Sequence, residues 1–242
     1  MGKLFAVGDI HGHYAALTDL MATLHRDADL RPDSDTVVFL GDYVDGGPDT
    51  RSVITQLMAW QREHPHWRFL KGNHEDLMLD ALVYNFRIYG DFYIWWNQGG
   101  RETARSYLPA DASDYERAIM QPREYIPPDH LDWINALPLT YEQDGYVFVH
   151  AGFRPRIGLA GQRERDMLWI REEFIASDWD FDGKRVVFGH TPFHEPLVLP
   201  NKIGIDTIFH YFGKLTAVEL DTADPRGEPR FHFSRPIAGE RP

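Results

Sequence analysis

The chain has 242 residues, and its 25 Lys and Arg against 37 Asp and Glu give a formal net charge of −12. A chain this acidic repels polyanions, which excludes a nucleic-acid coat protein, although a local cation could still bind a small anionic substrate. The 43% hydrophobic and 26% charged residues are typical of a globular protein, and the length predicts a single domain over residues 1–242.

Cysteine is absent, which excludes disulfides, thiolate metal sites and cysteine nucleophiles. No stretch approaches the ~20 apolar residues that span a bilayer. The first apolar run, residues 4–7, is too short for the core of a secretory signal. We therefore expect a cytoplasmic protein with neither a polynucleotide nor a membrane as its partner.

The first 75 residues alternate between strand and helix patterns. Short apolar runs rich in β-branched and aromatic residues predict strands at 3–7, 36–40 and 67–70. Between them, apolar residues recur at helical spacing, first at Leu17, Leu20, Met21 and Leu24 and then at Val53, Ile54, Leu57 and Met58. This β-α-β-α-β order predicts an α/β fold with a parallel sheet and crossover helices.

The rest of the chain divides into a helical insertion, a second set of strands and a tail. A helix is expected at 75–84, and the aromatic-rich residues 84–137 are expected to form a largely helical, cap-like insertion with a helix at 113–120. Further strands are expected at 139–143, 146–149, 185–188 and 214–220, with one helix over 162–174. The tail, 221–242, contains four prolines and is expected to be loose apart from a strand at 230–233.

Five predicted strands lead into a short polar motif that contains glycine. The motifs are Gly8-Asp9-Ile10-His11-Gly12, Gly41-Asp42-Tyr43-Val44-Asp45, Gly72-Asn73-His74-Glu75, His150-Ala151-Gly152 and Gly189-His190-Thr191. Because ligands of open α/β sheets bind at the carboxyl ends of the strands, we expect these motifs to converge on one place.

The convergent donors mix carboxylate, imidazole and amide groups: Asp9, His11, Asp42, Asn73, His150 and His190. This mixture suits Mn²⁺, Fe or Zn²⁺ better than Ca²⁺ or Mg²⁺, which prefer shells of oxygen alone. Six donors are too many for one tetrahedral ion. A shared carboxylate could instead hold two ions ~4 Å apart, as in two-metal hydrolases.

In this order, the five motifs resemble those of the phosphoprotein phosphatase family of calcineurin-like metallophosphoesterases, and most of all its bacterial serine/threonine phosphatase branch. The resemblance runs from residue 5 to about residue 220. It implies two mixed β-sheets packed face to face, helices on the outside, and a dinuclear metal site at one edge of the sheets.

The resemblance also implies a role for each motif residue. Asp9, His11 and Asp42 would bind one ion, and Asp42, Asn73, His150 and His190 the other, with Asp42 bridging. A hydroxide between the metals would attack phosphorus in line. His74 would be the general acid, and Asp45 would keep it cationic. The pairing of Asp45 with His74 also follows from general chemistry, since a carboxylate beside an imidazole raises the pKa of the imidazole.

The phosphate-binding cations depart from the family pattern. Arg171 resembles one phosphate-binding arginine of the family, and a planar guanidinium suits bidentate contact with phosphate oxygens. Gly46 stands where the family has its other arginine, in Gly-Asp-x-Val-Asp-Arg-Gly. We expect Arg51, five residues further on, to substitute, with Arg154 and Arg156 as alternatives.

The resemblance implies hydrolysis of a phosphomonoester with two divalent ions, Mn²⁺ first and Fe or Zn²⁺ as alternatives. The expected substrate is a phosphoserine or phosphothreonine protein, or a small phosphorylated compound. Hydrolysis of a nucleotide anhydride such as diadenosine tetraphosphate is the alternative, which the missing arginine favours. A third interpretation is a weakly active, metal-binding regulator. The retained His74 and Asp45 argue against it, because a pure binder needs no proton donor.

Overall fold

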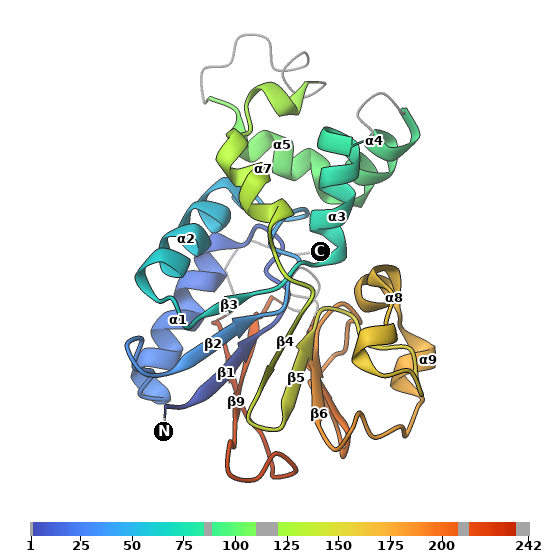
Figure 1. Ribbon diagram of the computed structural model, residues 1–242. Coiled ribbons are helices and arrows are strands. Elements are labelled where there is room, and N and C mark those ends of the chain that lie inside the picture. Colours follow the sequence, from blue (N-terminus) through green and yellow to red (C-terminus); the bar gives the residue numbers. More distant parts are fainter. Residues whose placement is uncertain (1, 85–88, 110–120, 208–212, 236–242) are drawn as a thin grey trace.

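The structure is a computed structural model that describes residues 2–84, 89–109, 121–207 and 213–235 (Figure 1). Two five-stranded sheets form its centre, with the strand orders β10-β9-β1-β2-β3 and β4-β5-β6-β8-β7. This arrangement confirms the predicted α/β fold with two mixed sheets.

The first sheet contains the predicted parallel core. Strands β1 (Leu4–Val7), β2 (Thr36–Phe39) and β3 (Arg68–Phe69) run parallel. The crossovers between them are α1 (Tyr14–Asp27) and α2 (Thr50–Glu63). Two antiparallel strands complete the sheet, β9 (Thr216–Leu220) beside β1 and then β10 (Arg230–Phe233), as the strand patterns near the C-terminus predicted.

The second sheet also has three parallel strands, β5 (Tyr146–Val149), β6 (Arg185–Phe188) and β8 (Lys202–Gly204). Its antiparallel edges are β4 (Thr140–Gln143) and β7 (Leu197–Leu199). The sequence analysis missed β7 and β8. Each has only three residues, and the Lys-Ile-Gly of β8 carries none of the apolar alternation that marks a longer strand.

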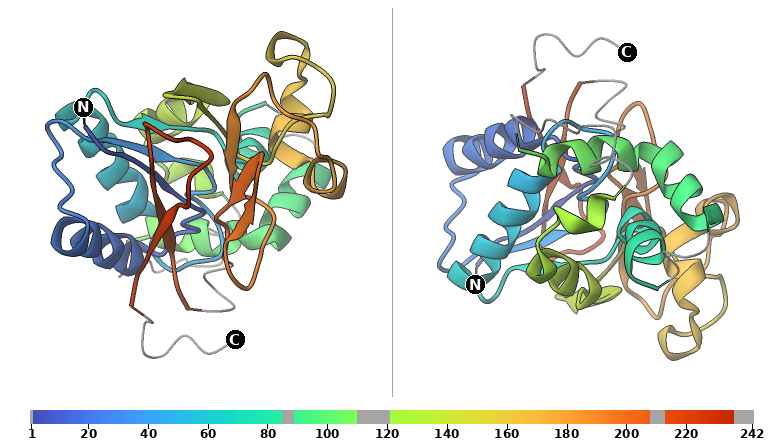
Figure 2. Two further views of the ribbon diagram at one scale, coloured as in Figure 1. Left: turned by 90° about the horizontal axis from the view of Figure 1, so that it is seen from below. Right: turned by 90° about the horizontal axis from the view of Figure 1, so that it is seen from above.

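The sheets pack face to face between two layers of helices (Figure 2). Leu4 and Ala6 of β1 point into the core between the sheets, where Phe148 of β5 also packs. Phe5 and Val7 point the other way, against α1 and α2. Both faces of β1 are therefore buried, which is why its sequence is a continuous apolar run rather than an alternation.

The outer face of the second sheet is covered by α8 (Glu164–Trp169) and α9 (Glu172–Ile175). The predicted single helix over 162–174 was wrong. Ile170 ends α8 in an extended conformation (φ −66°, ψ 142°), and its side chain is buried. The Lys202 ammonium donates to the carbonyl oxygens of Phe174 (2.6 Å) and Ser177 (2.7 Å), which secures the end of α9.

Helices stand over the carboxyl ends of the parallel strands (Figures 1 and 2). The helix expected at 75–84 begins earlier, as α3 (Asn73–Leu79), and ends in a π-helical turn, Asp80–Tyr84. The helices that follow are α4 (Tyr89–Trp95), a π-helical turn at Trp96–Gly100, α5 (Arg101–Tyr107), a 3₁₀ turn at Pro122–Glu124 and α7 (Pro128–Asn135). The helix expected at 113–120 lies outside the described residues.

Among the described residues, no helix combines the length and the apolar character needed to cross a membrane.

Candidate active site

Six parallel strands, three from each sheet, bring their carboxyl ends together. The residues that follow these strands are Asp9, Asp42, Asn73, His150, His190 and Asp206. Five of them line a cavity of about 310 Å³ together with His11, His74 and Arg171, while His150 is buried behind it. The structure thus brings together the six donors predicted from the strand-end motifs, and it adds Asp206, to which the sequence analysis assigned no role.

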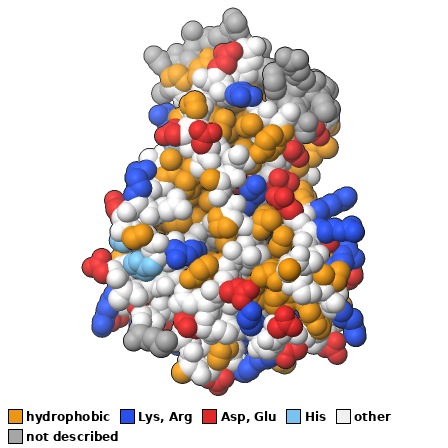
Figure 3. Space-filling view, viewed as in Figure 1, with side chains coloured by type: hydrophobic (Ala, Val, Ile, Leu, Met, Phe, Trp, Pro, Cys, Tyr) orange, Lys and Arg blue, Asp and Glu red, His pale blue; other side chains and the backbone are white. Residues whose placement is uncertain are grey.

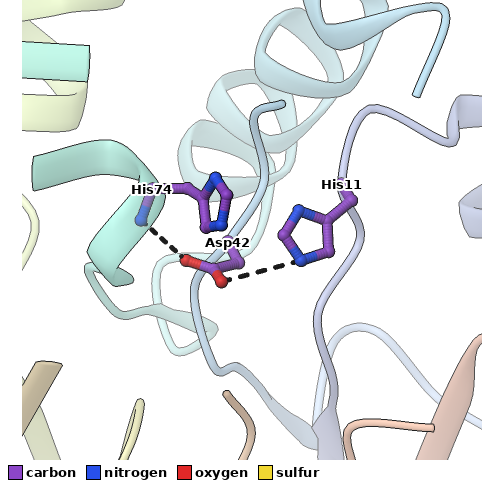
Figure 4. Close-up of side chains that lie close together, drawn as sticks. All are labelled: His11, Asp42 and His74. Carbon is purple, nitrogen blue, oxygen red and sulfur yellow. Dashed lines mark hydrogen bonds and ion pairs between the residues drawn. The ribbon is translucent and has the colours of Figure 1, made fainter. Parts of the chain in front are cut away.

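Asp42 lies at the centre of this cluster. Its Oδ2 is 3.6 Å from His11 Nε2, and its Oδ1 is 3.4 Å from His150 Nε2. The backbone N–H of His74 donates to Oδ1 at 3.0 Å, and the imidazoles of His11 and His74 lie next to each other beside the carboxylate, with 4.8 Å between their ring centroids (Figure 4). Asp42 belongs to both groups of side chains that could hold a metal ion, one with His11 and His74 and the other with His150 and His190.

Asn73 joins the two histidines from the second sheet. Its side-chain oxygen lies 2.8 Å from His150 Nε2 and 2.7 Å from His190 Nδ1. The other ring nitrogen of His150, Nδ1, lies 2.9 Å from the carbonyl oxygen of Leu40. A hydrogen bond there fixes the ring and leaves Nε2 facing Asp42, which is how proteins commonly orient a metal-binding histidine.

The charges of the cluster fit a cation. Asp9 accepts the backbone N–H of His190 at Oδ2 (2.9 Å), but its buried Oδ1 has no hydrogen-bond partner among the described residues. Burial and the carboxylates of Asp206 and Asp42 raise the pKa of Asp9 well above its ordinary value. Carboxylates crowded in this way, with an unpartnered oxygen, fit divalent metal ions.

The histidines from the second sheet are electrically suited to bind metal. Burial and the neighbouring His150 lower the pKa of His190 to about 2, and burial also lowers the pKa of His150. Both rings are therefore neutral at pH 7, the form in which imidazole binds a metal. Burial would raise the pKa of Asp42, but positive charge on the nearby imidazoles, His74 among them, holds this pKa below its usual range, so the carboxylate is ionised.

Several of these side chains stand on left-handed backbone. The φ angles are 47° at His11, 50° at Asp42, 71° at Asp45 and 60° at His190. Left-handed backbone turns the chain sharply just after a strand, so that the side chains of successive strand ends meet in one cavity.

His74 and Asp45 form a close pair at the edge of the cavity. His74 Nδ1 is 2.9 Å from Asp45 Oδ2, and Asp45 is fully buried. Burial would lower the pKa of His74, but the carboxylate of Asp42 and the hydrogen bond that His74 donates to Asp45 outweigh it and raise this pKa to about 9. The imidazole is therefore cationic at neutral pH and carries a proton that it can donate.

The helical insertion contributes directly to this pair. The second oxygen of Asp45, Oδ1, accepts hydrogen bonds from Trp95 Nε1 (3.0 Å) and Thr103 Oγ1 (2.8 Å). The sequence analysis favoured cap packing as the role of the aromatic stretch and missed both contacts. Trp95 and Thr103 lie 50 and 58 residues from Asp45, so no local pattern could have revealed them.

Glu75 holds the loops that carry the donors. Its carboxylate is fully buried and accepts the backbone N–H groups of Gly72, Asp42 and Tyr43, each at 2.8 Å. These bonds tie the loop after β2 to the loop after β3. The bond from Gly72, three residues earlier, is a capping-box contact that local spacing can indicate, whereas the bonds from Asp42 and Tyr43 span 33 and 32 residues and leave no local signal.

Replacing Glu75 with glutamine is expected to lower the free energy of unfolding by about 1–3 kcal/mol, because an NH₂ group then faces backbone N–H donors that lose their acceptor. Chemical denaturation of the two proteins measures this. The exposed Glu63 at the end of α2 offers a matched control, and Glu63→Gln should change stability by less than about 0.5 kcal/mol. Equal stabilities of all three proteins would contradict the role given to Glu75.

The predicted phosphate-binding arginines lie in different surroundings. Arg171 lines the cavity from the break between α8 and α9. Arg51 is exposed on α2 and does not line the cavity. Arg154 is engaged by Asp166 and Glu173 in ion pairs of 2.9 and 3.3 Å. Arg156 is not among the residues that line the cavity either.

The space beside Gly46 is open to the cavity. Among the described residues, a Cβ at Gly46 would have only the Cβ of His11 within 4 Å, at 3.9 Å. Gln98, from the π-helical turn of the insertion, lines the cavity next to it. The backbone N–H of Gly46 donates to the carbonyl oxygen of Gly99 (3.2 Å), which ties that turn to the loop. The cavity is thus lined here by Gly46 and the neutral Gln98, where the family pattern has an arginine.

A larger cavity of about 800 Å³ lies next to the site, and it is lined by Lys71, Asp76, Asp80, Tyr84, Glu164, Arg165 and Trp169. Trp169, which lines the larger cavity, is in edge-to-face contact with His190, which lines the smaller one, with 6.0 Å between the ring centroids. Figure 3 shows acidic, basic and apolar side chains interspersed on this face of the molecule. Tyr84 and Trp169 are exposed aromatics at the rim.

Known proteins of similar sequence include serine/threonine-protein phosphatases and bis(5'-nucleosyl)-tetraphosphatases. Serine/threonine-protein phosphatase 1 of Salmonella typhimurium is 28% identical over 222 residues, covering 90% of this chain and 91% of its own. The asymmetrical bis(5'-nucleosyl)-tetraphosphatase PrpE of Anoxybacillus flavithermus is 26% identical over 239 residues, covering 89% and 91%.

Solved structures share the fold. A crystal structure of a proposed diadenosine tetraphosphatase superposes with a TM-score of 0.64 at 22% identity, covering 97% of this chain and 94% of the other. The sequence match to the calcineurin-like phosphoesterases extends over residues 2–218. The chain therefore belongs to the calcineurin-like phosphoesterase family.

Proposed function

We propose that this chain is a metal-dependent phosphomonoester hydrolase of the serine/threonine protein phosphatase type. The observation that carries the proposal is the pair of His74 and Asp45, whose Nδ1 and Oδ2 lie 2.9 Å apart beside the donor cluster. A serine or threonine alkoxide is a poor leaving group, and it departs readily only when it receives a proton. The similarity to a serine/threonine-protein phosphatase supports the same assignment.

The donor residues fit two divalent ions that share Asp42. Asp9 and His11 would hold one ion, and Asn73, His150 and His190 the other. When bound, the ions supply Lewis-acid charge to the phosphoryl group and lower the pKa of water at the site. The mixed oxygen and nitrogen donors, without sulfur, support Mn²⁺ as the resident metal.

The remaining steps belong to side chains of the chain itself. Arg171 binds the phosphoryl oxygens from the open side of the cavity. The hydrogen bond between Asp45 and His74 Nδ1 leaves Nε2 as the nitrogen that donates its proton to the leaving oxygen while the phosphorus–oxygen bond breaks. Arg171 contacts the phosphoryl oxygens and His74 Nε2 contacts the leaving oxygen of the same group. The two side chains together therefore fix the orientation of the substrate.

Gly46→Arg tests whether the site lacks a cation. We expect KM for p-nitrophenyl phosphate to fall roughly tenfold, since a charge-assisted hydrogen bond contributes about 1.5 kcal/mol. Gly46 has a φ of 87°, so any side chain there is strained, and Gly46→Ala provides the matched control with the same strain and no charge. Steady-state kinetics of the three proteins give the answer. An unchanged or raised KM in Gly46→Arg would mean that another group already binds the phosphate.

Hydrolysis of a dinucleoside tetraphosphate is the second candidate function. Two observations favour it: Gly46 leaves the site short of one positive charge, and Tyr84 and Trp169 flank a cavity large enough for a nucleoside. A phosphorus atom within an anhydride carries less negative charge than a monoester and needs fewer cations. The similarity to the tetraphosphatase relative supports this candidate.

One comparison separates the candidates. The metal-stripped protein is supplied with Mn²⁺ and given p-nitrophenyl phosphate, a phosphothreonine peptide and diadenosine tetraphosphate in parallel. Mn²⁺-dependent release of phosphate from the peptide supports the protein phosphatase. Cleavage of the dinucleotide alone supports the tetraphosphatase. No turnover of any substrate, with two ions bound, would contradict both and support the weakly active regulator.

A further inference from the structure

Asp45 has more hydrogen-bond partners than the pairing with His74 requires. Its Oδ1 accepts from Trp95 Nε1 and Thr103 Oγ1, and its backbone N–H donates to Thr103 Oγ1 at 2.8 Å. The donors come from α4 and α5, two helices of the insertion, whereas Asp45 lies in the loop after β2. The insertion therefore contacts both the side chain and the backbone of Asp45.

The hydroxyl of Thr103 has its full complement of partners. It donates its proton to Asp45 Oδ1 and accepts the backbone N–H of Asp45. Thr50 Oγ1, 3.1 Å away, supplies the remaining contact. One donor and two acceptor positions are all that a threonine hydroxyl offers, so its orientation is fixed.

Burial makes this arrangement rigid. The side chains of Asp45, Trp95 and Thr103 are each fully excluded from solvent. The indole of Trp95 packs directly on Gly100, where a Cβ would come within 2.4 Å of the ring. With no water to take over a lost hydrogen bond, each donor that is removed leaves part of the buried carboxylate unsatisfied.

We propose that Trp95 and Thr103 are positioning residues, which hold Asp45 in the one orientation that presents Oδ2 to His74. The inference rests on the proposed function, because it assigns these residues to proton donation by His74. The insertion is then part of the catalytic apparatus and not only a cap over the strand ends. The backbone hydrogen bond from the Gly46 N–H to the carbonyl oxygen of Gly99 also ties the insertion to the loop that carries Asp45.

Thr103→Val tests this through the choice of leaving group. A phenolate from phenyl phosphate needs a proton, whereas the weakly basic 2,4-dinitrophenolate departs without one. General acid catalysis contributes roughly 10²–10⁴-fold, so partial misplacement of Asp45 should cost part of that. We expect kcat for phenyl phosphate to fall at least about tenfold and kcat for 2,4-dinitrophenyl phosphate to change by less than about threefold. A general loosening of the site would lower both rates equally.

Further variants make the result specific. Trp95→Phe removes the N–H donor and keeps an aromatic ring, and it should show the same selective loss. Thr103→Ser keeps the hydroxyl and should restore kcat for phenyl phosphate to within about threefold of wild type. Thr23→Val deletes a hydroxyl from another buried helical threonine, in α1, and should leave the ratio of the two rates unchanged.

The possible failures can be told apart. If the wild-type protein with Mn²⁺ hydrolyses neither aryl phosphate, the proposed function fails. If His74→Asn shows the selective loss but Thr103→Val and Trp95→Phe lower both rates equally, the proposed function stands and the positioning role is overturned. Should Thr103→Val not fold, Trp95→Phe decides the question: an unchanged ratio of the two rates in this variant overturns the positioning role as well.

Discussion

His74→Asn is expected to lower kcat for a phosphothreonine peptide by roughly 10²–10⁴-fold, because it removes the proton that the alkoxide needs. KM should change little, since Arg171 and the donor cluster remain. The backbone N–H of His74, which donates to Asp42, is retained, so the loop keeps its conformation. Steady-state kinetics and metal analysis of the purified variant measure both effects.

The structure makes the metal content the decisive part of this experiment. His74 also belongs to one of the groups that could hold a metal, with His11 and Asp42. If His74 is the general acid, the variant binds as many ions as the wild-type protein. If the variant loses an ion, His74 is a ligand and another group must donate the proton. Asp45, whose Oδ2 binds His74 Nδ1, would then orient a ligand instead of an acid.

Asp42→Asn is expected to have the second large effect, a loss of bound metal together with at least about a 10³-fold loss of kcat. Asp42 is the one carboxylate common to both groups of donors, so its charge acts on both ions. Asparagine has nearly the same shape and tolerates left-handed backbone, so the variant tests the charge and not the φ of 50° at this position.

Metal analysis after dialysis, with a titration of Mn²⁺, checks the effect of Asp42→Asn. The surface variant Asp33→Asn removes the same charge from an exposed site and should bind two ions. Two ions bound at wild-type affinity in Asp42→Asn would rule out the shared role of this carboxylate. The remaining donors would then have to be divided between the ions in another way.

The strands and crossovers at the start of the chain could be predicted because local pattern and burial agree there. The strands β1 and β2 are short continuous apolar runs, and α1 and α2 have one apolar face each. The break at Arg171 could not be predicted, because the helical spacing of 162–174 persists through it. Tertiary contacts decide this region: the burial of Ile170 and the hydrogen bonds from Lys202.

The cluster could be predicted for a different reason. The polar residue after each parallel strand is marked by its position, and topology alone brings such positions together. Asp206 was missed because β8 was missed. Trp95, Thr103 and Glu75 were missed because their contacts join segments that no spacing rule connects. The proximity of the donors is established, whereas their roles as metal ligands stay predictions until metal is measured.

The left-handed backbone at four site residues has a consequence for how this protein can change. Outside glycine, such a conformation costs about 1–2 kcal/mol per residue relative to the right-handed regions, and somewhat less for Asp and His. Glycine at position 11 or 190 would relieve that strain, but the protein would then lack an imidazole donor. The sequence is therefore not the most stable one for its own fold. Selection for heat resistance alone would favour substitutions that remove these donors, at the expense of activity.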